Sequence, residues 1–282
     1  MIDTALNARQ LSAVEYRGGP LLVLAGAGSA LLAGRVGASA SVSAVGMGYL
    51  EGLGRPGALD PRVAFVPPSA VDPRYDHAIY VNPAWSGEGM QKMWVLERAG
   101  TGWRLAVSDP DHWKGAEPAY SWPVSTGKLW PGNNRAGLTP TGIFNIDERA
   151  HRHRRGWGSP GMYKAVYIDL HYSSGRVSGV AMHGTTSNMY RRLGQPASHG
   201  CVRMTTANAD RMWGLIHHPG GATREASERW GEVPRYFASE PADSMAARQG
   251  YVRDGSVLYD AAGRKLTKEG YRVLLVFFRD DL

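Results

Sequence analysis

The sequence predicts a mainly β fold with few helices. Apolar and polar residues alternate over 92–97, 103–108, 164–170 and 179–183, as they do along half-buried strands, and strands are expected again over 251–278. Helical spacing is clear over 206–216. The 282 residues include 36 Gly and 17 Pro, which suit short strands joined by turns. With 43% hydrophobic residues, such a chain can bury one large core or two small ones.

Strands are expected from His77 onward. Alternating segments flank the turn Ala99-Gly-Thr-Gly102, which predicts a β-hairpin. Trp94, Trp103 and Trp122 occupy alternating strand positions, so we expect them in or near the core. The strands expected here are 92–97, 103–108, 164–170 and 179–183.

The clearest helix is predicted over 206–216, where Ala209, Met212, Trp213 and Ile216 share one face. Thr206 is the expected N-cap, and Pro219-Gly220 would stop the helix. A polar segment follows over 217–250. The apolar run 271–278 suits a buried strand that completes a sheet or a small appended subdomain.

Residues 1–44 have two interpretations. A basic flank, an apolar segment over 21–34 and small residues over 38–44 are typical of a secretory signal peptide. The stretch 6–29 also resembles the start of UvrD-type DNA helicases, which would make it a wrong or fused start. Ser29 is followed by Ala-Leu-Leu where a phosphate-binding loop needs Gly-Lys-Ser/Thr, so no nucleotide site is expected. Residues 45–76 are rich in Pro and Gly and are predicted to be a linker or a surface arm.

Charge and cysteine content narrow the function classes. There are 32 Lys+Arg and 25 Asp+Glu, and the net charge of +7 favours anionic surroundings. The basic run 151–155 is typical of a nucleic-acid patch, but a solvated loop explains it as well, and no nucleic-acid partner is predicted. No apolar run is long enough for stable membrane insertion of the mature form. One Cys excludes an internal disulfide.

The single cysteine stands in Ser198-His199-Gly200-Cys201, ahead of the predicted helix. A lone Cys is commonly an apolar filler, but these polar neighbours favour a nucleophile. Gly200 lets the backbone approach a substrate, and the helix N-terminus would favour the thiolate. His183 ends a predicted strand. A thiol and an imidazole brought together form an activated nucleophile and a general acid.

Three blocks of residues together resemble the signature of the L,D-transpeptidase (YkuD-type) family. The first is His183-Gly184-Thr185, which a spacer separates from the second, Ser198 to Arg203. The third comprises 122–128 and 138–144, which resemble the two strand-and-turn segments that precede the catalytic strand. The blocks occur in the family's order, and the resemblance covers about residues 77–217.

The resemblance implies a β-sandwich catalytic domain over 77–217. Residues 218–282 are expected to form a C-terminal extension with β-strands. It implies a cysteine acyl transfer on peptidoglycan. The enzyme attacks the carbonyl of the third residue of a tetrapeptide stem, expels the terminal D-alanine and passes the acyl group to an amine. No cofactor and no metal are implied, and carbapenems are expected to acylate the nucleophile.

The resemblance also assigns roles to residues. Cys201 would be the nucleophile and His183 its base, with Ser198 and His199 orienting the pair and the loop. The backbone N–H groups of Gly200 and Cys201 would form the oxyanion hole. The remaining positions expected near the substrate are Gly184, Thr185 and Arg203, although Arg203 also suits a loop brace.

Several alternatives stay open. The acyl acceptor can be a second stem, giving a 3→3 cross-link, a lysine of an envelope protein, or water, giving a carboxypeptidase or a hydrolase of anchor bonds. A zinc peptidase would use His183, His199 and Cys201 with His217 or His218. A non-catalytic wall-binding module is a further alternative. Because peptidoglycan lies outside the cytoplasmic membrane, we expect export to a periplasm or cell wall and a role in wall organisation and cell shape.

Overall fold

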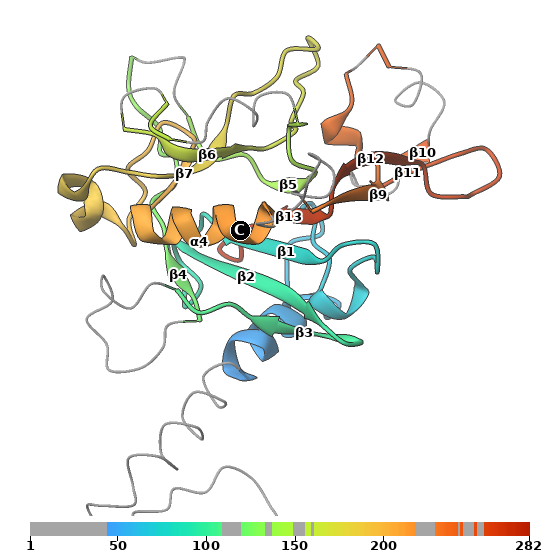
Figure 1. The fold of residues 1–282 in the computed structure, drawn as a ribbon, viewed down its shortest axis with the longest axis horizontal. Helices are drawn as coiled ribbons and strands as arrows, with labels where there is room; N and C mark the ends of the chain where they lie inside the picture. The colour runs from blue at the N-terminus through green and yellow to red at the C-terminus, as the bar shows by residue number, and fades with distance from the viewer. Residues whose placement is uncertain are drawn as a thin grey trace, which may run out of the picture.

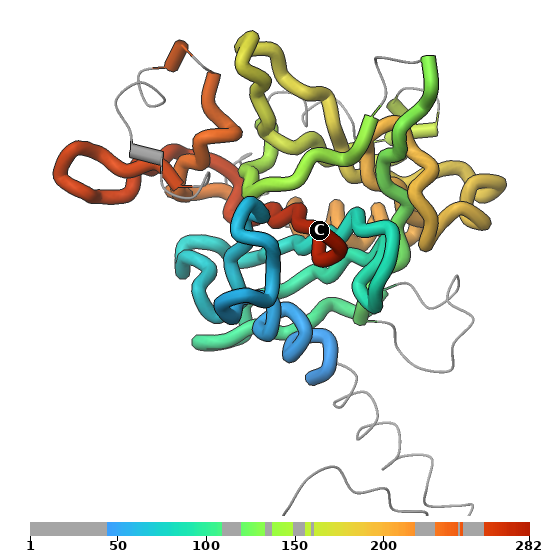
Figure 2. The backbone as a smooth tube through the Cα atoms, turned by 180° about the vertical axis from the view of Figure 1, so that it is seen from behind, coloured from blue at the N-terminus to red at the C-terminus, as the bar shows by residue number. Residues whose placement is uncertain are grey.

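The fold is mainly β, as predicted, and two of its sheets are joined by a shared core (Figures 1 and 2). Its strands form one six-stranded sheet, one three-stranded sheet and two two-stranded sheets. None of the helices in the described residues is long and apolar enough to cross a membrane. The computed structural model describes residues 44–108, 120–132, 137–148, 156–158, 161–217, 229–241, 243–244, 251–252 and 257–282.

The six-stranded sheet has the order β3-β2-β1-β13-β5, with β4 also paired to β2. β1 and β13 are parallel and the other pairs are antiparallel. The predicted hairpin is confirmed, since Ala99 of β2 pairs with Gly102 of β3. The strands are β1 His77–Asn82, β2 Lys92–Ala99, β3 Gly102–Leu105, β4 Trp122–Pro123, β5 Gly142–Phe144 and β13 Val273–Phe277.

The three-stranded sheet lies above the larger one in Figure 1, with α4 crossing between them in that view. It comprises β6 (Tyr163–Tyr167), β7 (Ala181–Gly184) and β8 (Val202–Met204). β6 and β7 are antiparallel, whereas β7 and β8 are parallel.

The helix α4 spans Thr206–Ile216, the range predicted from its apolar spacing. The predicted N-cap, Thr206, is wrong by one residue. Thr205 has the extended backbone that an N-cap needs, and its hydroxyl accepts a hydrogen bond from the Asn208 N–H at 3.1 Å.

The largest apolar cluster fills the space between the two sheets and α4. It brings together Val95 of β2, Leu275 of β13, Met182 of β7, Val202 of β8 and Met212 of α4. A second cluster covers the other face of the six-stranded sheet. Trp94 and Trp122 are buried and Trp103 is half-buried, as expected from their strand positions.

The segment expected to be a linker or an arm packs as an arm against the six-stranded sheet. It is helical over 44–53 and has a short 3-10 helix, η1, at Pro68–Ala70. Leu50, Val71 and Tyr75 are buried in the second cluster. These apolar residues are separated by prolines and turns, which is why no periodicity reveals their burial.

The C-terminal part extends the fold and also completes its main sheet. β13 runs between β1 and β5, which fits the first of the two expectations for this run. The preceding strands make the two small sheets, β9 pairing with β12 and β10 with β11. Their bounds are β9 Trp230–Pro234, β10 Tyr251–Val252, β11 Leu258–Tyr259 and β12 Thr267–Tyr271. Residues 1–43 and the basic run 151–155 lie outside the described residues.

Candidate active site

The three-stranded sheet has one face in the core and one face directed away from it. Met182, Val202 and Met204 belong to the main core. Since side chains alternate along a strand, the neighbouring residues point to the other face. There Ala181 and Cys201 meet in a small apolar cluster, and His183 pairs in register with Arg203. The sheet therefore brings Cys201, His183 and Arg203 to one face.

Cys201 is held as a neutral thiol. Burial raises the pKa of this thiol, while a hydrogen bond with the Ala181 backbone and the charge of Arg203 oppose the rise. The sequence-based expectation that the helix N-terminus favours the thiolate is wrong. Strand β8 lies between Cys201 and α4, and the effect of a helix dipole is confined to its first turn.

His183 is poised to accept a proton. Its Nδ1 lies 2.9 Å from the Gly184 carbonyl oxygen, which can only accept, so Nδ1 carries the hydrogen and Nε2 keeps its lone pair. Burial lowers the pKa of His183 to about 4; the charge of Arg203 acts in the same direction and the bond to Gly184 opposes it. The imidazole is therefore neutral at physiological pH.

Ser198 shapes the loop that carries Cys201. Its hydroxyl donates to the Cys201 carbonyl at 2.5 Å and accepts from the Gly200 N–H at 3.1 Å. Gly200 has a φ of +127°, a conformation that side-chain-bearing residues avoid. Because the Gly200 N–H is engaged by Ser198, the expected oxyanion hole loses one of its two donors in this conformation, and the Cys201 N–H is the better candidate.

Gly127 and Thr139, in the two segments that precede the catalytic motif in the sequence, support the loop that carries Cys201. The Thr139 hydroxyl donates to the Gly200 carbonyl at 2.8 Å and accepts from the Gly127 N–H at 2.8 Å. A Cβ atom at Gly127 would lie 2.2 Å from the Gly137 carbonyl oxygen and 2.8 Å from the Gly200 Cα. The chains approach so closely here that only glycine fits.

Gln91 is a loop-positioning residue that the sequence did not reveal. It is buried, its φ is +52°, and its side-chain amide exchanges hydrogen bonds with Thr126. The Thr126 carbonyl in turn accepts from the N–H groups of Ala197 and Ser198, each at 2.9 Å. A single Gln ahead of a strand gives no signal in the sequence, because its partner is distant along the chain.

The His199 side chain does not share the buried environment of the Cys201 and His183 side chains. It is exposed, and its ring stacks on Trp130 with a centroid distance of 4.8 Å. The Trp130 indole N–H donates to the Ser198 carbonyl at 2.8 Å. This arrangement makes His199 a brace of the loop.

Arg203, Gly184 and Thr185 are held by the protein itself. The Arg203 guanidinium donates to the Ala197 carbonyl at 3.1 Å, which makes it the loop brace that the sequence suggested. A Cβ atom at Gly184 would lie 3.0 Å from the Thr206 Cα, so this glycine lets β7 pack against α4. Thr185 is buried, and its N–H donates to Met204.

Residues 104–225 match the family model of the L,D-transpeptidase catalytic domain, YkuD. Over these residues the chain is similar to an L,D-transpeptidase catalytic domain. The matched segment includes β6, β7, β8 and α4, and therefore both Cys201 and His183. The strands β1 and β13 of the six-stranded sheet lie outside it.

Solved structures of L,D-transpeptidases are similar to parts of this chain. L,D-transpeptidase 3 from Mycobacterium tuberculosis, in complex with a faropenem-derived adduct, is 17% identical, with 48% of this chain and 54% of that chain covered and a TM-score of 0.30. An L,D-transpeptidase from Mycobacterium tuberculosis H37Rv is 18% identical, with coverages of 49% and 52% and a TM-score of 0.31. An L,D-transpeptidase from Mycobacterium smegmatis is 18% identical, with 47% of this chain and 64% of that chain covered and a TM-score of 0.22. The chain thus spans about half the length of the first two. No curated protein matches it.

The described residues offer no cluster of side chains suited to a metal ion. No group of three or more His, Cys, Asp or Glu side chains among the described residues is placed to hold one. His217, at the end of α4, packs its ring on Trp213 with a centroid distance of 4.2 Å. His218 lies outside the described residues. The described geometry therefore gives the zinc alternative no support.

Proposed function

We propose that this domain is a peptidoglycan L,D-transpeptidase in which Cys201 is the nucleophile and His183 the general base. The observation that carries the proposal is the state of His183. It shares a sheet face with Cys201, and its Nδ1–H bond to Gly184 leaves Nε2 as the proton acceptor. A neutral imidazole and a neutral thiol on one sheet face form the resting state from which a base-assisted attack begins.

The reaction begins at the carbonyl of the third residue of a tetrapeptide stem. The Cys201 sulfur bonds to this carbon as His183 Nε2 takes the thiol proton. The oxygen of the tetrahedral intermediate accepts a hydrogen bond from the Cys201 N–H, a contact that gains strength as negative charge develops. The bond to the terminal D-alanine then breaks, and His183 returns the proton to the leaving amine.

The thioester is resolved by an acceptor amine. His183 removes a proton from this amine as its nitrogen attacks, and the thiol leaves with the proton that His183 returns. A second stem gives a 3→3 cross-link, and an envelope-protein lysine gives an anchor. Water in place of the amine makes the same site a carboxypeptidase or a hydrolase of anchor bonds.

The other residues assigned to the site hold the loop that carries Cys201 and the strand end that carries His183. Ser198, His199 and Arg203 hold the loop through contacts to Cys201, Trp130 and Ala197. Gly184 and Thr185 fix the end of β7, next to His183. Because the substrate is peptidoglycan, we propose that the protein acts outside the cytoplasmic membrane, in a periplasm or cell wall.

Intact mass spectrometry of the protein with a disaccharide-tetrapeptide tests this function. We expect release of D-alanine and, when a second stem or a free D-amino acid is added, a cross-linked or exchanged product. A tripeptide product alone would instead identify a carboxypeptidase. Absence of any product would contradict both forms of the proposal.

A matched variant tests the nucleophile. Incubation with a carbapenem should give a covalent adduct on the wild-type protein and none on Cys201→Ala, since the adduct is a thioester. An adduct that persists on Cys201→Ala would show that another residue is the nucleophile. Activity of the wild-type protein that is lost on treatment with a chelator would instead point to the zinc alternative.

A further inference from the structure

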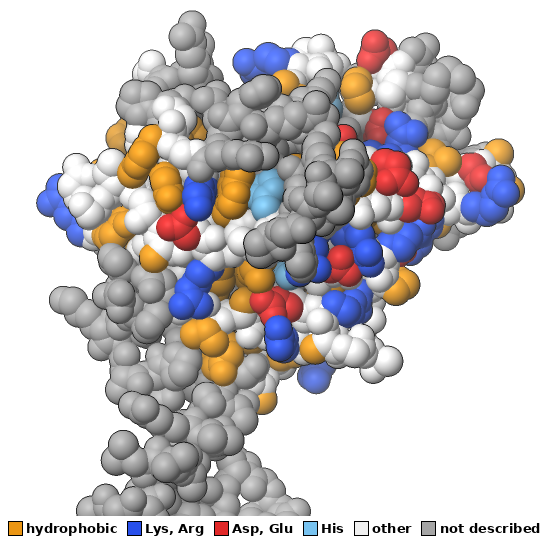
Figure 3. Space-filling view, viewed as in Figure 1, with side chains coloured by type: hydrophobic (Ala, Val, Ile, Leu, Met, Phe, Trp, Pro, Cys, Tyr) orange, Lys and Arg blue, Asp and Glu red, His pale blue; other side chains and the backbone are white. Residues whose placement is uncertain are grey.

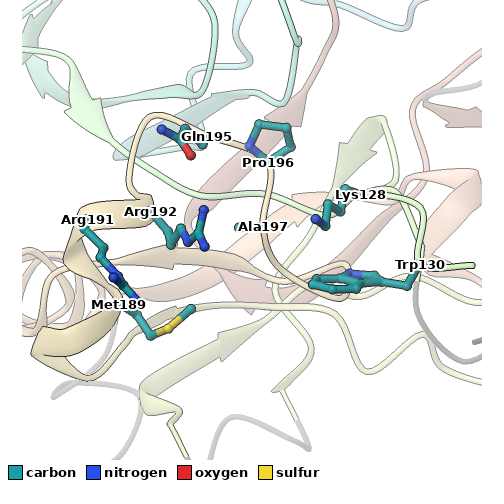
Figure 4. Close-up of a pocket in the computed structure, with 8 residues that line it drawn as sticks. All are labelled: Lys128, Trp130, Met189, Arg191, Arg192, Gln195, Pro196 and Ala197. Carbon is teal, nitrogen blue, oxygen red and sulfur yellow. The ribbon is translucent and has the colours of Figure 1, made fainter.

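A basic cavity lies beside the loop that carries Cys201. It has a volume of about 430 Å³ and opens between the 3-10 helix η3 (Ser187–Arg192) and the turn that follows β4. Figure 4 shows Arg192 and Lys128 entering it from opposite sides, with their charged ends turned toward the space between them. The lining residues are Lys128, Trp130, Met189, Arg191, Arg192, Gln195, Pro196 and Ala197.

The charge of this cavity is uncompensated within the described part of the chain. Three of the lining residues are cations and none is acidic. Among the described residues, Lys128, Arg191 and Arg192 form no ion pair, and Lys128 lies instead over the Trp130 ring at 4.1 Å. Six other described arginines do pair with a carboxylate, namely Arg62, Arg74, Arg104, Arg235, Arg264 and Arg279. In Figure 3, acidic and basic side chains mix on the side of β9 and β12, whereas the lining of the cavity holds cations without an acidic residue.

The cavity and the nucleophile share a wall. Ala197 lines the cavity, and its carbonyl accepts from Arg203, on the other side of the loop. Trp130 lines the cavity too, and it is bonded to Ser198 and stacked on His199. A molecule bound at Cys201 can therefore extend along this loop and place a group among the cations.

We propose that this cavity binds a carboxylate of the stem peptide whose reacting carbonyl lies at Cys201. The inference rests on the proposed function, which supplies a peptide with several carboxylates. Arginine guanidinium groups bind carboxylates through two parallel hydrogen bonds, and a lysine adds a point charge. Trp130, Met189 and Pro196 provide apolar surface for the aliphatic part of the group that carries the carboxylate.

Equilibrium binding to Cys201→Ala tests the inference without turnover. The probes are the tetrapeptide stem, the same peptide amidated at its C-terminus, and the same peptide amidated at its third residue. We expect one of the amides to bind about ten-fold more weakly than the parent, because a charge-assisted hydrogen bond is lost. The weaker amide identifies the carboxylate. Equal affinity for all three peptides, or no binding, would overturn the inference.

Substitutions in the Cys201→Ala background locate the effect. Arg192→Glu should weaken the parent peptide about ten-fold and abolish its advantage over the weaker amide, whereas Arg192→Lys should keep part of that advantage. The control is Arg55→Glu, which makes the same charge change at an exposed arginine of the N-terminal arm. If Arg55→Glu and Arg192→Glu had the same effect, the cavity would not be the site.

The two proposals fail separately. If the wild-type protein turned over the substrate but Cys201→Ala bound the acid and amide peptides equally, the cavity proposal would be overturned and the transpeptidase function would stand. A preference for the acid that depends on Arg192, in a protein without turnover, would support the cavity and overturn the function.

Discussion

The two main sheets of this protein bury their strands differently. In the six-stranded sheet, β1 and β13 are buried at every position, with one apolar cluster on each face. In the three-stranded sheet, Met182 and Val202 enter the shared core, but the opposite face holds Cys201, His183 and Arg203. The central strands of the large sheet are thus buried on both faces, whereas one face of the small sheet carries the candidate catalytic groups.

A pair of histidines makes this difference measurable. His77 begins β1 of the large sheet, and His183 lies in β7 of the small sheet. Both are buried, and burial lowers the pKa of each to about 4. They thus differ in location rather than in ionisation, and each can serve as the control for the other.

The largest expected effect is the loss of catalysis in His183→Gln. Without the base, the rate of Cys201 acylation should fall on the order of a thousand-fold, since general bases typically contribute 10² to 10⁴. The measurement is the rate of carbapenem adduct formation by intact mass. His77→Gln should stay within about two-fold of the wild-type rate, because this residue is remote from the attack; equal losses in both variants would contradict the assignment of the base.

Truncation of a core side chain in the six-stranded sheet should lower the stability of the fold and leave the acylation rate nearly unchanged. Leu275 of β13 is fully buried in the shared core, and Leu275→Ala should lower the free energy of unfolding by about 3 kcal/mol. Denaturant titration measures this loss. Below the unfolding transition, the acylation rate should stay within about two-fold of wild type, and a parallel fall would show that the two sheets are not separable in this way.

The pH dependence of stability should report the two histidines. Each is neutral in the folded protein down to about pH 4, whereas in the unfolded chain it gains a proton below about 6.5. Stability is therefore full above pH 6.5 and falls as the pH drops toward 4, by up to about 3 kcal/mol per histidine. Denaturant titrations at pH 7 and pH 4.5 measure the fall. His77→Gln and His183→Gln should each remove about half of it, and an unchanged slope in both would contradict this origin.

Local sequence signals predicted the elements whose determinants are close together in the chain. The spacing of Ala209, Met212 and Ile216 defined α4, and the turn at 99–102 defined the β2-β3 hairpin. The same kind of signal singled out Cys201 and His183, which the structure places on one sheet face. It did not reveal that β8 separates Cys201 from the helix, since the four residues 202–205 are equally compatible with a loop.

Features that depend on distant pairing were not predictable. Leu50 and Tyr75 are buried against a face of the six-stranded sheet, and the Pro-rich sequence around them has no periodic pattern that predicts this burial. The engagement of the Gly200 N–H by Ser198 depends on a local fold with an unusual φ. The basic cavity arises because the chain brings Lys128 and Arg192 together across residues that give no periodic pattern.

The position of β13 also has a consequence for how the protein is made. β1 begins at residue 77, yet its parallel neighbour begins at residue 273, so the centre of the main sheet stays incomplete until that late strand has left the ribosome. Long-range parallel pairing of this kind is intrinsically slow to form. Until β13 has been made, one edge of β1 lacks its native neighbour and is open to unwanted pairing.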